Sequence, residues 1–147
     1  MNPGLDANSE ELAKVVLARF GLVPRKNDAK AGFHKLLIEL YEAKKLALKE
    51  KRPEYAILPV ETMALHAGIA RQTMYDHLSR WKQLQIIKKT SVVRNSEVII
   101  GYELNGNNLE AAFRRAESII NGHIERSIEV IQDLQNTIKK EKLKSKR

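Results

Sequence analysis

Two hydrophobic periods alternate along the 147 residues of the chain. In five segments the apolar residues recur every three or four positions, which predicts amphipathic helices. These segments are 9–20, 28–50, 60–67, 70–84 and 109–142. We expect the second helix to begin at Asp28 and to end at about Glu50, before Pro53.

Between the fourth and fifth helices the period changes from helical to alternating. Residues 86–94 and 97–104 are rich in Val, Ile, Thr and Tyr, which predicts two strands. Asn95-Ser96 is a plausible two-residue turn between them, so we expect a β-hairpin with Arg94 opposite Glu97 and Val93 opposite Val98. The short apolar run 55–58 predicts one more small strand that pairs with the hairpin.

The third and fourth helices form the most informative stretch of the chain. One face of the third helix carries the small and apolar side chains of Met63, Ala64 and Ala67. Gly68 follows this helix, and Gly adopts the left-handed backbone conformation that ends a helix at the lowest free-energy cost. Ile69 fills the corner. A buried stripe on the fourth helix then comprises Met74, Leu78 and Trp81.

This stretch resembles the helix-turn-helix of winged-helix regulators of the MarR-like, GntR-like and PadR-like groups. The residues that carry the resemblance are Ala64-x-x-x-Gly68-Ile69, Arg71-Gln72-Thr73-Met74-Tyr75-x-His77-Leu78-x-Arg80 and Leu84-Gln85-Ile86-Ile87. The resemblance covers about residues 29–104. Two positions depart from the family pattern: Ala70 stands where Ser or Thr usually caps the recognition helix, and Gln85 where Gly usually ends it.

The resemblance implies a mainly α fold with a small β-hairpin wing, in which a winged helix-turn-helix core precedes a long C-terminal helix. We expect an N-terminal extension helix in residues 1–27, a winged-helix DNA-binding domain in 28–105, and a dimerisation helix with a basic tail in 106–147. PadR-like proteins have a similar layout, with dimerising helices after the winged helix.

The face of the fourth helix opposite its buried stripe carries long or hydrogen-bonding side chains, the types that reach base edges and phosphates. Arg71 and Gln72, at the start of the helix, are expected to read bases in the major groove. Arg can form a bidentate hydrogen bond with guanine, and Gln can form one with adenine. Asp76 can either pair with Arg80 or accept a hydrogen bond from a cytosine amino group. The full set of expected DNA-binding residues is Arg71, Gln72, Thr73, Tyr75, Asp76, Ser79, Arg80, Lys82, Lys88, Lys89 and Arg94.

Three of these residues lie on the predicted hairpin. Lys88 and Lys89 could either contact phosphates or simply keep a strand edge solvated. Arg94 is favoured as a DNA contact because a wing tip can reach the adjacent minor groove.

The last helix is longer than a small domain needs to cover itself, and its stripe favours pairing with a second copy of the chain. The residues expected to carry this pairing are Phe113, Ile120, Ile124, Ile128, Ile131, Leu134 and Ile138. Two alternatives stay open: the helix can pack back on its own domain, and it can bend or split at Asn121-Gly122, because Gly in a helix costs about 1 kcal/mol.

Composition narrows the partners and the chemistry. The net charge is +8 and the pI about 9.7, which favours a polyanionic partner such as nucleic acid or an acidic membrane surface. The chain has no Cys, so disulfides and thiolate chemistry are excluded. Its four histidines lack metal-ligand spacing, and no phosphate loop or nucleophile motif is present. We therefore expect no enzyme activity and no cofactor or metal, and a cytoplasmic, nucleoid-associated protein without a membrane span.

The function expected from these features is sequence-specific binding of double-stranded DNA by a homodimeric transcriptional regulator, with the effector ligand unknown. One alternative is a DNA-binding accessory protein of plasmid or viral replication, partition or chromatin, since a fold does not fix a function. Another alternative is a winged-helix module that binds proteins.

Overall fold

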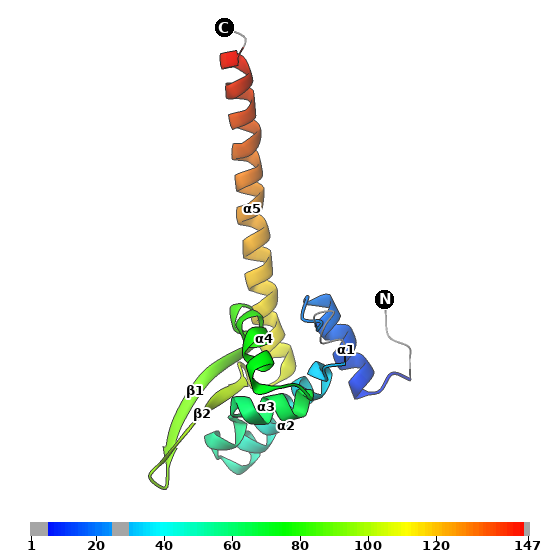
Figure 1. Cartoon of the computed structure of the whole chain (residues 1–147), viewed down its shortest axis with the longest axis vertical. Coiled ribbons are helices and arrows are strands. Elements are labelled where there is room, and N and C mark those ends of the chain that lie inside the picture. Colours follow the sequence, from blue (N-terminus) through cyan, green and yellow to red (C-terminus); the bar gives the residue numbers. More distant parts are fainter. Residues whose placement is uncertain (1–5, 25–29, 146–147) are drawn as a thin grey trace.

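A helical core, a two-stranded hairpin and one projecting helix make up the structure, a computed structural model that describes residues 6–24 and 30–145 (Figure 1). The elements in chain order are α1 (Ser9–Arg19), α2 (Phe33–Glu50), the 3-10 helix η2 (Pro53–Ala56), α3 (Val60–Ala67), α4 (Arg71–Gln83), β1 (Ile87–Arg94), β2 (Glu97–Leu104) and α5 (Leu109–Ser145). The predicted fold class, mainly α with a small hairpin and a long C-terminal helix, is confirmed.

The core lies where α2, α3, α4 and the base of the hairpin meet. Its centre is Phe33, whose ring packs edge-on against His77 at 4.6 Å and against Trp81 at 6.1 Å between centroids. Met74 and Leu78 are also buried, so the predicted stripe of α4 faces inward. The other face of α4 is therefore left to the surface.

The corner between α3 and α4 has the predicted geometry. Gly68 is left-handed, with φ of 69°, and the N–H of Ile69 donates to the carbonyl of Ala64 over 3.0 Å. Ala70 has the extended backbone of an N-cap, but its side chain supplies no cap to α4. Both helices are thus held by backbone bonds and by their buried faces.

A left-handed glutamine ends α4. Gln85 has φ of 57°, and the next N–H, that of Ile86, donates to the carbonyl of Trp81 over 3.2 Å. The side-chain amide of Asn105 donates to the carbonyl of Gln85 over 3.0 Å. The chain therefore ends α4 with a left-handed Gln85, where Gly would adopt this conformation at less cost, and Asn105 helps to hold it.

The hairpin has the predicted register. Arg94 pairs with Glu97 and Val93 with Val98 in the antiparallel pair of β1 and β2. Asn95 and Ser96 both have positive φ, of 51° and 66°. This is the turn type that matches the twist of two tightly connected strands.

The prediction of a small strand at 55–58 was wrong. Pro53–Ala56 forms the 3-10 helix η2 instead, and only Leu58 pairs with the hairpin, through an isolated bridge to Tyr102. The two backbone bonds of this bridge measure 2.8 and 2.9 Å. Pro53 at the first helical position fixes φ and lacks an N–H, which suits a helical turn and not a ladder. The bridge brings the backbone of Leu58 against Gly101, where a Cβ would lie 2.3 Å from the Leu58 carbonyl oxygen.

The helix expected from Asp28 begins at Phe33, and Asp28 itself lies outside the described residues. Just before it, the N–H of Gly32 donates to the carbonyl of Ala67 over 2.7 Å. This bond ties the chain to the end of α3 and keeps Gly32 out of the helix. The predicted end at Glu50 is confirmed.

Helix α5 runs without interruption through Asn121 and Gly122, so the bend or split weighed there is not found. Asn108 caps its start, with the side-chain oxygen accepting from the N–H of Ala111 over 2.8 Å. The helix leaves the core and projects from it, and residues 128–145 are all exposed (Figure 1). Within the described part of the chain, no helix is both long enough and apolar enough to cross a bilayer.

Candidate nucleic-acid interface

The outer face of α4 is an uncovered row of polar side chains. Gln72, Asp76 and Ser79 are exposed at spacings of four and three residues, opposite the buried stripe. Gln83 continues the row one turn later and is also exposed. The sequence analysis missed Gln83, although the spacing of the other three residues points to it.

Arg71, Tyr75 and Lys82 lie on the side of α4 that faces the hairpin. The ammonium of Lys82 is 5.9 Å from the ring centroid of Tyr102 on β2. A cleft of about 360 Å³ separates the start of α4 from the strands; the residues that line it are Pro59, Val60, Glu61, Arg71, Tyr75, Lys89, Ile100, Gly101 and Tyr102. Two cations from different elements, Arg71 and Lys89, thus share one cleft.

The opposite side of α4 carries Thr73 and Arg80. Thr73 is half-buried, and Arg80 is exposed. A guanidinium nitrogen of Arg80 approaches to 3.9 Å of the place where a Cβ on Gly21 would be. Arg80 therefore points toward the turn after α1, away from the cleft.

Arg71 is held at the start of α4 by two neighbours. Its guanidinium donates to the carboxylate of Glu61 on α3 over 2.9 Å and to the hydroxyl of Tyr75 over 3.4 Å. The hydrogen bond with Tyr75, followed by the charges of Tyr75 and Glu61, raises the pKa of Arg71 above its ordinary value. All three side chains are exposed, so the charged fork of Arg71 is oriented while still open to a ligand. Nothing in the sequence signals Glu61, which is ten residues away across a turn.

The cations of the hairpin are in different situations. Lys88 is exposed, and its ammonium lies 4.0 Å from the carboxylate of Glu103 on β2. That carboxylate also pairs with Lys44 of α2, and this pair is buried. Lys89 lines the cleft beside α4.

Arg94 does not extend from the tip of the hairpin. Its guanidinium pairs with the carboxylate of Glu54 in η2 and lies 5.9 Å from the ring centroid of Tyr55. The tip itself consists of Asn95 and Ser96. A contact of Arg94 with DNA would therefore have to replace its contact with Glu54.

The residues expected to pair two copies fall into two groups. Phe113 and Ile120 pack against the core of their own domain, and the ring of Phe113 meets that of Phe20 edge-on at 4.8 Å. The other five remain about half exposed; they are Ile124, Ile128, Ile131, Leu134 and Ile138. The first three turns of α5 thus pack on the domain, and the rest of the stripe is uncovered.

The histidines are dispersed. His77 is buried against Phe33, and His34 lies beside α1, where burial and then the charge of Lys14 lower its pKa. His66 is half-buried on α3 and His123 exposed on α5. In residues 6–24 and 30–145, no three His, Asp or Glu side chains are grouped so that they could hold a metal ion.

Comparison with known proteins adds no assignment, because neither a family model nor a curated protein sequence matches this chain.

Proposed function

We propose that this protein binds double-stranded DNA in a sequence-specific way, as a transcriptional regulator made of two copies of the chain. The polar face of α4 enters the major groove, and the hairpin lies along the backbone beside it. A helix in the major groove reads bases with the side chains at its start, which here are Arg71 and Gln72.

The observation that carries the proposal is the exposed face of α4 with cations on both of its sides. Gln72, Asp76 and Ser79 offer donors and acceptors along its centre. Lys82 on one side of this row and Arg80 on the other are cations of the kind that contact the phosphates of the two strands beside an inserted helix. The net charge of +8 supports a polyanionic partner of this kind.

The orientation of Arg71 supports base reading by that residue. A guanine offers two acceptors to a planar guanidinium, so recognition improves when the fork is already fixed. Glu61 and Tyr75 hold the fork at the exposed start of α4. Asp76 and Ser79 then lie one and two turns further along the groove.

The test begins with selection of bound fragments from random DNA, followed by anisotropy titrations of the selected site and of a scrambled one. Arg71→Ala should weaken binding of the selected site by about 1–3 kcal/mol and leave the scrambled site little changed. Lys45→Ala is the matched control, because it removes a cation that lies over Tyr41 on α2, and it should leave the preference for the selected site unchanged.

Two outcomes would contradict the proposal. If no sequence is enriched, or if Arg71→Ala weakens both sites equally, α4 does not read bases. If binding to DNA does not weaken steeply with added salt, phosphate contacts are not involved, and a protein partner becomes the better explanation.

A further inference from the structure

An apolar groove lies beside the root of α5. It is formed by α1, α2 and the first turns of α5 and has a volume of about 490 Å³. Its apolar lining includes Leu12, Val16, Phe20 and Phe113, and Glu42 and Glu110 lie at its polar rim. A groove of this kind next to a half-exposed apolar stripe indicates a surface that another chain covers.

The stripe of α5 continues the groove along one line of the helix. Since each residue of an α-helix turns by about 100°, Ile124, Ile131 and Ile138 lie within about 20° of the direction of Phe113. Phe113 lines the groove, so the exposed stripe and the groove form one apolar surface. That surface runs from the core to the free end of α5.

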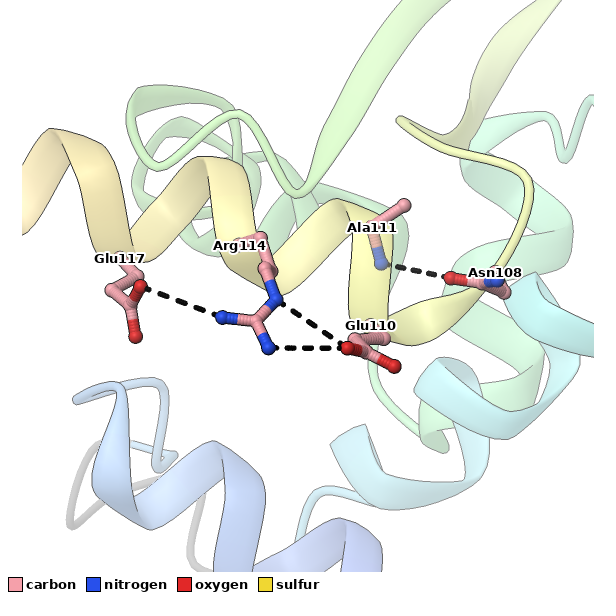
Figure 2. A network of polar contacts seen from close by, with 5 residues as sticks. All are labelled: Asn108, Glu110, Ala111, Arg114 and Glu117. Carbon is pink, nitrogen blue, oxygen red and sulfur yellow. Dashed lines mark hydrogen bonds and ion pairs between the residues drawn. The ribbon is translucent and has the colours of Figure 1, made fainter.

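The rim of the groove is acidic. Figure 2 shows Glu110 and Glu117 on either side of Arg114, on the side of α5 that faces α1. The guanidinium of Arg114 lies 3.2 Å from Glu110 and 4.0 Å from Glu117, so one cation serves two carboxylates. With Glu42 there are three carboxylates against two cations, Arg114 and Lys45, whose ammonium lies 5.8 Å from the ring centroid of the groove-lining Tyr41. The net charge of the rim is therefore −1.

The free end of α5 is basic. Residues 139–145 contain four lysines and one glutamate, which gives a charge of +3. All of these side chains are exposed, and Leu143 among them is apolar and 67% exposed. At about 100° per residue, Lys142 lies about 20° and Lys139 about 80° from the direction of Phe113, whereas Leu143 points about 120° away from it. The far end of the helix therefore offers positive charge along the line of the stripe.

We propose that two copies of this chain pair through antiparallel α5 helices, so that the basic end of each α5 lies over the acidic groove of the other copy. Ile120 meets Ile138 of the second copy, and Ile124 meets Leu134. The basic end, 139–145, then lies along residues 113–119 of the second copy. This arrangement rests on the proposed pairing of two copies but not on DNA binding.

A parallel pair would use the same stripe less well. It would place two ends of charge +3 side by side, and like charges in contact are destabilising. It would also leave the groove uncovered. The five steps from Ile120 to Ile138 cover 18 residues, a period of 3.6, so the stripe follows a straight helix and does not demand the long supercoil of a parallel heptad pair.

Cysteine cross-linking tests the orientation without DNA, and the natural absence of Cys makes single variants unambiguous. Ile124→Cys and Leu134→Cys are each prepared alone and mixed, then oxidised. In the antiparallel pair only the mixture forms a disulfide between copies, because position 124 of one copy lies about 15 Å along the axis from position 124 of the other. Disulfides in each single variant, with none between the two, would mean a parallel pair and overturn the proposal.

A distance measurement between the two copies tests the antiparallel orientation even if the register of the helices differs from the one given above. With a spin label on Lys140→Cys, the antiparallel pair puts the two labels at least about 30 Å apart, because 22 residues of helix separate them along the axis. A parallel pair brings the labels together at the helix ends. A short distance, or a single-copy mass in sedimentation, would overturn the proposal, whatever the result with DNA.

A charge exchange tests the groove itself. One variant carries Lys139→Glu and Lys142→Glu, the two lysines nearest the line of the stripe, and the other carries Glu42→Lys and Glu110→Lys. Each alone should pair on the order of tenfold more weakly, since like charges then meet, and a mixture of the two should recover the native affinity as a mixed pair. If the mixture is no tighter than either variant, the end of α5 does not lie in the groove.

Discussion

At the scale of single residues, Glu61 is the least expected member of the interface. Its carboxylate fixes the fork of Arg71, yet it also adds a negative charge where phosphates are proposed to bind. The orientation of Arg71 affects the preference for one DNA sequence over another, whereas the repulsion of phosphates affects the affinity for every sequence. The two effects can therefore be measured separately. Glu61 should increase discrimination between sequences while it lowers the affinity for DNA in general.

Glu61→Gln should therefore bind scrambled DNA more tightly than the native protein and prefer the selected site less. We expect the ratio of the two affinities to fall by about fivefold, within the range of a single bidentate contact. Anisotropy titrations on both sites measure it. Glu129→Gln, on the exposed part of α5, is the control; an unchanged ratio in Glu61→Gln would mean that Arg71 needs no orientation from α3.

Of the glycines that the structure describes, Gly101 leaves the least room for a methyl group. A Cβ there would lie 2.3 Å from the Leu58 carbonyl oxygen, and backbone cannot move aside as a side chain can. Gly101→Ala should lower the free energy of unfolding by about 2–3 kcal/mol, as overpacking of a rigid site does.

The control for this prediction is the same substitution in α5. At Gly122 an added Cβ meets only the flexible end of Arg126, at 3.4 Å. Gly122→Ala should stabilise the protein by up to about 1 kcal/mol, because Gly is the poorer helix former. Urea denaturation measures the change in unfolding free energy for both variants. If both variants are stabilised, or both are destabilised, this account of Gly101 is wrong.

At the scale of elements, the position of the hairpin is set by contacts with α2 and η2. The buried pair of Lys44 and Glu103 joins α2 to β2, Leu58 joins the segment after η2 to Tyr102, and Glu54 of η2 holds Arg94. These contacts are spread along the hairpin, so it is attached at more than its base. Its cations are therefore presented at a fixed position relative to α4.

Removing one partner of the buried pair should show how strongly it joins the two elements. Lys44→Met leaves the carboxylate of Glu103 with only the more distant Lys88, and we expect a loss of about 3–5 kcal/mol in unfolding free energy. Combining it with Glu103→Leu should recover most of that loss, since no buried charge remains. Chemical denaturation of the native protein and both variants measures this, and a double variant as unstable as the single one would mean that lost packing is responsible.

The elements that the sequence predicted well are those with a strong local signal. The stripe of α4, the left-handed Gly68 and the turn at Asn95–Ser96 all follow from residue types at fixed spacing. The start of α2 and the helical turn η2 were predicted wrongly, because contacts between distant segments decide them. Gly32 is held by Ala67, and the small strand was replaced by a single bridge at Leu58.

The candidate interface was predictable to the same extent. Exposure of Gln72, Asp76 and Ser79 follows from the helical period alone. The carboxylates that pair with the cations could not be predicted in this way. Glu61 lies on another helix than Arg71, and Glu54 is forty residues from Arg94. Ion pairs between exposed groups on different elements leave no periodic trace in a sequence.

At the scale of the whole molecule, the uncovered stripe of α5 is the feature that a single copy does not explain. Ile131→Asp places a charge in the middle of it, 18 residues after Phe113 and on the same line. We expect sedimentation to show a single copy of this variant, where two copies are proposed for the native protein. Binding to a two-part DNA site should fall to that of a single half-site.

Gln132→Asp, which adds the same charge one position away from the stripe, is the matched control. It should leave both the mass and the DNA affinity close to native. If Ile131→Asp keeps the native mass, the copies do not pair through this face.

The unbroken course of α5 has a consequence for how such a protein can change. Because every residue adds about 1.5 Å and about 100° of rotation, a rigid helix converts an insertion into a defined translation and turn. In the proposed pair, a gain of 18 residues, five whole turns, would move the two domains about 27 Å relative to each other without altering which of the present side chains meet. A gain of two residues would rotate the apolar stripe by about 200°, to the opposite side of the helix, and would abolish the proposed pairing. We therefore expect related proteins to differ in the length of this helix by whole turns.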